Sequence, residues 1–160
     1  MLSQDFALAE LEVSGEFPNL ASPMPSALVP RAKQLVARGL QPVRDQLGRP
    51  MRILSGYRSH ALNRAVGGQP TSQHLVAEAA DWTCEDLRDA IDDVIRMILA
   101  GELKGIGQII YYPDKHFIHM ATISGRFPTP TVCIHWPSRK YQYRVVTPLS
   151  VEAFGALVPR

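Results

Sequence analysis

The sequence predicts an α+β fold in which helices pack on a small antiparallel sheet. The first observation is a helical period of apolar residues from Leu87 to Leu99, which follows acidic residues that suit a helix N-terminus. The second is a group of short strand-like runs late in the chain, at 108–112, 117–122, 131–135 and 142–146. Because helical patterns cluster early and strand patterns late, segregated layers are favoured over alternating β and α units.

The remaining elements follow in chain order. Residues 1–23 predict a short helix and an extended arm, and apolar spacing from Pro25 predicts a helix that stops at Gly48. Gly39 and Pro42 interrupt this pattern, so we expect a kink or a break there. The other expected elements are strands at 51–55 and 79–83, a helical turn at 59–66, and turns at 113–115 and 136–140. The helix that contains Leu87 is expected to be capped by Thr83, with Glu85 and Asp86 in its first turn. Gly101 or Gly105 is expected to end it.

Composition limits the classes of function. At 160 residues the chain is long enough for a single domain over 1–160, with a substantial core. The net charge of +2 and the lack of a Lys/Arg run argue against nucleic-acid binding. Cys84 and Cys133 lie far apart in sequence, so neither a thiolate zinc site nor a disulfide framework is expected.

The N-terminus has no cationic region followed by an apolar stretch, and no segment reaches membrane-spanning length. We therefore expect synthesis in the cytoplasm without a signal peptide and without membrane insertion. Any target outside the cell must then be reached by another route.

Two imidazoles and one carboxylate form the candidate chemical group. His74 and Asp81 lie seven residues apart across an expected loop-to-strand transition, and His119 lies in an apolar strand. Zinc accepts this ligand set in hydrolytic sites and keeps a fourth position for water. A lone histidine on such a strand is more often a core residue, and Arg58 alone would more often be a surface or capping residue. If the groups converge, however, Arg58 can grip a carboxylate or stabilise an oxyanion.

The motifs around these residues resemble a known family. Ser55-Gly56-Tyr57-Arg58-Ser59, Leu62-Asn63, Val66-Gly67-Gly68 and Ser72-Gln73-His74-Leu75 through Ala79-Ala80-Asp81 are similar to the zinc D-alanyl-D-alanine carboxypeptidase family of peptidoglycan peptidases. The resemblance runs from about residue 5 to about residue 122. The subgroup that it most resembles includes short phage-borne or prophage-borne cell-wall peptidases without signal peptides.

The resemblance implies a fold of the Hedgehog/D-Ala-D-Ala-peptidase type and assigns roles to individual residues. It implies that His74, Asp81 and His119 bind Zn²⁺, that Arg58 stabilises the oxyanion, and that Ser72 binds substrate. We expect Tyr57, next to Arg58, to bind substrate as well.

The general base is where this chain departs from the family pattern. The family commonly has a carboxylate three residues before its last ligand, where this chain has His116, and Asp114 is a second candidate. A neutral imidazole can accept a proton, because the unperturbed pKa of a histidine side chain lies near 6.5. His116 can equally be a fourth metal ligand or an exposed turn residue. A further departure is Ala77, which stands where relatives usually have glycine.

We therefore expect zinc-dependent hydrolysis of peptide bonds involving D-amino acids in peptidoglycan, as a carboxypeptidase or an endolysin-type endopeptidase. The expected partners are peptidoglycan stem peptides, and the expected state is a monomer that acts on the cell wall after release or phage-mediated export. The alternative is a catalytically weak or inactive zinc-containing module that binds cell walls or serves as a phage structural part. The absence of the usual carboxylate at position 116 keeps that alternative open.

Overall fold

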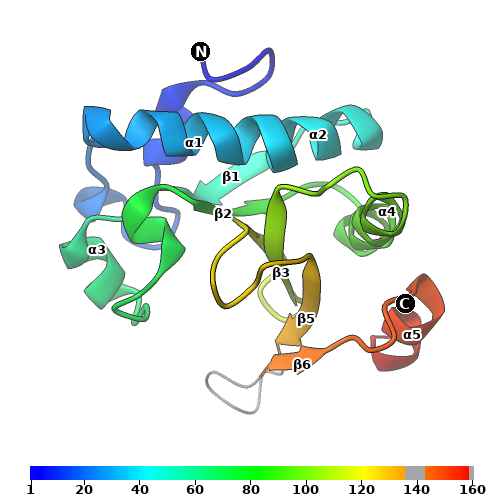
Figure 1. Ribbon diagram of the computed structural model, residues 1–160. Helices are drawn as coiled ribbons and strands as arrows, with labels where there is room; N and C mark the ends of the chain where they lie inside the picture. Colours follow the sequence, from blue (N-terminus) through cyan, green and yellow to red (C-terminus); the bar gives the residue numbers. More distant parts are fainter. Residues whose placement is uncertain (136–142, 159–160) are drawn as a thin grey trace.

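The computed structural model describes residues 1–135 and 143–158, and it confirms the α+β class (Figure 1). The α-helices are α1 (Val29–Leu35), α2 (Gln41–Leu47), α3 (His60–Ala65), α4 (Leu87–Leu99) and α5 (Val151–Leu157). Short 3₁₀ turns are η1 (Leu8–Glu12), η2 (Pro18–Leu20), η3 (Ser26–Leu28) and η5 (Gln73–Val76), and η4 (Val36–Leu40) is a π-helical turn. The strands are β1 (Arg52–Ser55), β2 (Ala79–Thr83), β3 (Ile106–Tyr112), β4 (Phe117–Thr122), β5 (Thr131–His135) and β6 (Tyr143–Val145).

The strands form a mixed sheet in the order β1-β2-β4-β3-β5-β6. The expectation of an antiparallel sheet is wrong at one pair, because β3 and β5 run parallel. After β4 the chain crosses to the far side of β3, and β5 reverses direction relative to β4. On that side its direction matches that of β3, so a parallel ladder results.

The α1–η4–α2 segment forms one continuous rod over the sheet (Figure 1). The interruption expected at Gly39 and Pro42 is a π-helical turn rather than a break. A Cβ atom at Gly39 would lie 2.5 Å from Ile106 Cδ1, so glycine lets the rod approach β3 closely. The rod ends as predicted at Gly48, which has a positive φ of 61°.

The predicted start of α4 is wrong by several residues. Thr83 does not cap the helix, because it is the last residue of β2 and pairs with Arg52 of β1. This pairing keeps the chain extended, and the helix begins only at Leu87, after Asp86 in a left-handed conformation. Gly101, with a φ of 76°, follows the helix end as expected.

One face of the sheet packs against the helices, and the opposite face carries the candidate site residues. Trp82, Ile118 and Tyr111 belong to the same buried apolar cluster as residues of α1, α2 and α4, so that face carries the core. Because side chains alternate along a strand, Asp81 and His119 lie on the opposite face. We call this opposite face the site face.

The C-terminal part was predicted only in part, because helix α5 (Val151–Leu157) was not expected from the sequence. The strand expected at 142–146 is found as β6, whereas the turn expected at 136–140 lies outside the described residues. None of the described helices is both long and apolar enough to span a bilayer.

Candidate metal centre

Asp81 and His119 meet because their strands are neighbours. They are directly opposite each other in the antiparallel β2–β4 ladder, where facing side chains are in contact range. His119 Nδ1 lies 2.8 Å from Asp81 Oδ1. The spacing of 38 residues between them is therefore closed by strand pairing.

His74 reaches the same point from the 3₁₀ turn η5. Its Nδ1 lies 2.6 Å from the carbonyl oxygen of Gly56, which can only accept a hydrogen bond. Nδ1 therefore carries the proton of the neutral ring, and Nε2 presents a lone pair to the site. That Nε2 lies 3.3 Å from Asp81 Oδ1 and 3.2 Å from His119 Nδ1.

The donor set fits a metal ion. One ligand atom from each of His74, Asp81 and His119 lies within 4.8 Å of the other two. The His74 lone pair and the Asp81 carboxylate are both acceptors, so a cation between them removes their mutual repulsion. Zinc is bound in proteins by this combination of imidazole nitrogen and carboxylate oxygen. His74 is 2% and Asp81 7% exposed, so the pair is shielded from competing water.

The electrostatics favour the deprotonated forms of Asp81 and His74. Burial alone would raise the pKa of Asp81, but the adjacent His74 and His119 outweigh it and hold that pKa well below its usual range. Burial lowers the pKa of His74, against the opposing influence of Asp81. Metal ligation requires a carboxylate and neutral imidazoles, so both directions favour a bound cation.

Arg58 lies directly beside the ligand group. One terminal guanidinium nitrogen donates to Asp81 Oδ2, and Nε donates to Ser55 Oγ at 2.9 Å. Asp81 therefore keeps Oδ1 for the ligand cluster while Arg58 fixes its other oxygen. Partners of this kind orient a metal ligand and tune its basicity.

The two sequence motifs hold each other by backbone contacts. Arg58 N donates to the carbonyl oxygen of His74 at 3.0 Å, while His74 Nδ1 donates to Gly56. A Cβ atom at Gly56 would lie 2.3 Å from the carbonyl oxygen of Leu11, so only glycine fits there without a shift. The Gly56-Tyr57-Arg58 segment therefore sets the position of the His74 ring.

The Leu62-Asn63 and Val66-Gly67-Gly68 motifs shape the loop before His74. The Asn63 side chain donates to the carbonyl oxygen of Gln69 at 2.9 Å, and Gly68 N donates to the Asn63 carbonyl at 2.8 Å. A Cβ atom at Gly68 would lie 2.2 Å from Asn63 Oδ1, so glycine is needed for this contact. Gln73 then ties η5 to the end of β4 by donating to the Thr122 carbonyl at 3.0 Å.

The two predicted substrate residues, Ser72 and Tyr57, belong to the motifs that carry Arg58 and His74. Ser72 is the N-cap of η5, and its Oγ accepts from His74 N at 3.4 Å. Tyr57 packs in part against the apolar core. Ala77 has a left-handed φ of 58°, which gives a physical reason for the glycine of relatives. The substrate roles of Ser72 and Tyr57 stay predictions.

Both candidate bases lie in the exposed turn between β3 and β4. His116 immediately precedes β4 and has a positive φ of 53°. Asp114 Oδ1 lies 3.9 Å from His135 Nδ1 in β5, which flanks β3 on the side away from β4. Asp114 thus leans away from His119, and the choice of base stays a prediction.

Sequence reasoning missed Tyr112 and Tyr143, which lie on the site face. Tyr112 pairs with Phe117 across β3 and β4, and Tyr143 pairs with His135 across β5 and β6. The signal was present in the alternation of β3, because Tyr112 shares a face with Ile110, the partner of His119. It was lost because the parallel pairing of β3 with β5 joins segments that are distant in sequence.

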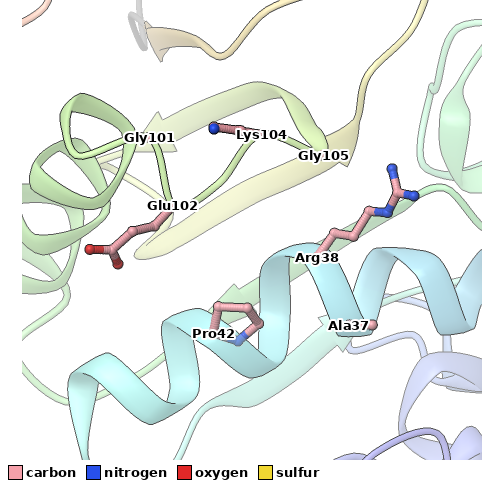
Figure 2. Close-up of a pocket in the computed structure, with 7 residues that line it drawn as sticks. All are labelled: Ala37, Arg38, Pro42, Gly101, Glu102, Lys104 and Gly105. Atoms are coloured by element: carbon pink, nitrogen blue, oxygen red, sulfur yellow. The ribbon is translucent and has the colours of Figure 1, made fainter.

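A pocket of about 370 Å³ lies apart from these residues (Figure 2). It lies between the η4–α2 part of the rod and the connection from α4 to β3, and its lining is Ala37, Arg38, Pro42, Gly101, Glu102, Lys104 and Gly105. None of the predicted site residues lines it.

A buried His-Asp-His cluster on the sheet of an α+β fold, supported by an arginine, fits the class of metal-dependent hydrolases. Residues 6–121 match the family described as Peptidase M15, and this is more than half of the chain. The chain therefore belongs to the M15 peptidase family, which the motifs resemble, and is a metallopeptidase that acts on peptides. No curated protein matches the chain.

Proposed function

We propose that this protein hydrolyses peptide bonds involving D-amino acids in peptidoglycan, with zinc as the cofactor. The observation that carries the proposal is the convergence of His74 Nε2, Asp81 Oδ1 and His119 Nδ1 within 4.8 Å, in a chain of a peptidase family. Its resemblance to D-alanyl-D-alanine carboxypeptidases supports the substrate class. Action on the cell wall after release or phage-mediated export agrees with that substrate.

His74, Asp81 and His119 would hold the ion. Zinc, when bound, would supply Lewis-acid polarisation of the scissile carbonyl and activation of a water. Arg58 has five N–H donors, of which the contacts to Asp81 and Ser55 use two. The remaining donors can stabilise negative charge on the carbonyl oxygen as it develops. Ser72 and Tyr57 would hold the peptide next to Arg58.

His116 is the first candidate for the general base and Asp114 the second. The base takes a proton from the attacking water and returns it to the leaving amine. We expect His116→Ala to lower kcat by about 100-fold or more if His116 has this role. If His116→Ala leaves the rate unchanged and Asp114→Ala lowers it, the base is Asp114.

The second candidate function is binding to cell walls without turnover. The imidazole at position 116, where relatives commonly have a carboxylate, is the observation that favours it. In this case the zinc site would position a stem peptide rather than cleave it.

The two functions are separated by incubating zinc-loaded protein with purified peptidoglycan. Release of free D-alanine supports a carboxypeptidase, and new amines without D-alanine support an endopeptidase. Asp81→Ala is the control, because it removes a ligand. Retained pelleting onto cell walls with neither product would contradict hydrolysis and support the binding module.

A further inference from the structure

Four aromatic rings form a row across the site face. The row consists of Phe117, Tyr112, His135 and Tyr143, which come from β4, β3, β5 and β6 in the order of the sheet. The Tyr112 ring stacks on Phe117 with centroids 4.3 Å apart, and on His135 with centroids 4.7 Å apart. Mutual stacking fixes the direction of the Tyr112 ring.

This aromatic row lies beside the metal centre. Phe117 is two residues before His119 on β4, and Tyr112 is two residues after Ile110, which pairs with His119. Residues two apart on a strand share a face, so the row is the next rank of side chains along the same surface. The charges of Asp81 and Arg58 both act on the Tyr112 phenol, which agrees with its place next to the site.

The row ends in a pair of hydroxyl groups. Tyr112 Oη lies 3.2 Å from Tyr143 Oη, and either atom can be the donor. Two hydroxyls carry two hydrogens, and their mutual bond uses one of them. Burial raises the pKa of Tyr112, so its phenol stays protonated. Tyr143 is 39% exposed, so the pair opens to solvent.

We propose that the Tyr112–Tyr143 hydroxyl pair is a substrate-binding subsite that donates a hydrogen bond to a carbonyl or carboxylate oxygen of the bound peptide. The inference rests on the proposed function, because it assigns the pair to the same substrate as the metal centre. Among the residues that the structure describes, the pair has one O–H left to donate, and an oxygen acceptor matches it. The stacked rings hold this donor at a fixed place on the site face, which limits the entropy lost on binding.

The test compares two tyrosines of the same strand. Tyr112→Phe removes the hydroxyl and keeps the stacked ring. Tyr111→Phe is the matched control, because Tyr111 lies on the core face, where its ring packs edge-on against Phe154 with centroids 5.6 Å apart. The probes are a synthetic stem pentapeptide that ends in D-Ala-D-Ala and the same peptide with an amidated C-terminus.

For the zinc-loaded protein we expect Tyr112→Phe to raise KM by about 3- to 10-fold, as the loss of one neutral hydrogen bond implies. We expect kcat within about twofold of wild type, because the hydroxyl binds the peptide equally in ground and transition states. Zinc content and melting temperature stay unchanged. Calorimetric Kd values for both peptides provide a readout that does not depend on turnover.

Each outcome decides a separate point. A penalty limited to the free peptide identifies a terminal carboxylate as the acceptor, and a penalty for both peptides identifies a carbonyl. Unchanged KM and Kd in Tyr112→Phe, or an equal change in Tyr111→Phe, overturns the subsite. A wild-type protein that binds the peptides without cleaving them contradicts carboxypeptidase activity alone, and the Kd comparison still tests the subsite.

Discussion

The side-chain contacts of Arg58 show what its position next to the candidate metal ligands allows it to do. From sequence alone its role could be structural or catalytic, whereas the structure has it bonded to a candidate ligand, Asp81, and to Ser55. Such a partner holds the ligand oxygen in place without binding the metal itself. The same guanidinium can therefore raise metal affinity, by holding Asp81 in place, and stabilise negative charge in the transition state.

We therefore predict two separate effects of Arg58→Ala. Zinc affinity should fall by about 10- to 100-fold, as is usual when a partner of a metal ligand is removed. Turnover at saturating zinc should be lost, because the oxyanion loses its donor. A competition titration with a chelating dye measures the first effect, and the release of D-alanine or of new amines from peptidoglycan measures the second. Arg64→Ala, on the exposed side of α3, should change neither value.

Ala77 yields a stability prediction. Its φ of 58° costs an L-residue roughly 1–2 kcal/mol, whereas glycine adopts this region freely. Glycine loses more backbone entropy on folding, which offsets about 0.5–1 kcal/mol. We predict that Ala77→Gly raises the free energy of unfolding by up to about 1 kcal/mol in a urea titration. Ala79→Gly, in β2, should lower it, and an equal loss in both variants would contradict the argument.

At the scale of elements, local patterns predicted most of the fold. The β2 and β4 bounds and the end of α2 at Gly48 match, since each depends on nearby alternation or turn chemistry. The parallel β3–β5 pair and the late start of α4 depend on partners distant in sequence, so they could not be predicted locally. The predicted ligands converge because β2 and β4 pair, and only the structure shows that pairing.

The Gly56 contact joins β1, η1 and η5, so we expect a substitution there to affect all three. In Gly56→Ala the new methyl group meets the Leu11 carbonyl at 2.3 Å, and the backbone must shift. We predict a loss of about 1–3 kcal/mol in stability. Zinc affinity should also weaken, because the Gly56 carbonyl orients His74.

Thermal unfolding and zinc titration measure these two effects. Gly125→Ala is the control, since a Cβ atom there would have no described neighbour within 4 Å. Full zinc affinity in Gly56→Ala would show that the carbonyl of residue 56 does not position the ligand.

For the whole molecule, the buried thiol of Cys133 predicts an alkaline loss of stability. Burial raises the pKa of Cys133 to about 11, above the roughly 8.5 of a thiol in an unfolded chain. The protonated Cys133 thiol therefore makes its full contribution to the unfolding free energy below about pH 8.5, and this contribution is lost as the pH rises toward 11. We predict that the difference in unfolding free energy between wild type and Cys133→Ala narrows over that range. A constant difference, measured by urea titrations at several pH values, would contradict this prediction.

The proposed activity depends most on the convergence of His74, Asp81 and His119 around one ion. The most direct measurement is the zinc content of purified protein, by mass spectrometry of the metal, for wild type and the three single alanine variants. We predict one zinc per chain in wild type and in His60→Ala, whose histidine is exposed in α3. The His74→Ala, Asp81→Ala and His119→Ala proteins should lose it. One full equivalent retained by folded ligand variants would contradict the metal centre.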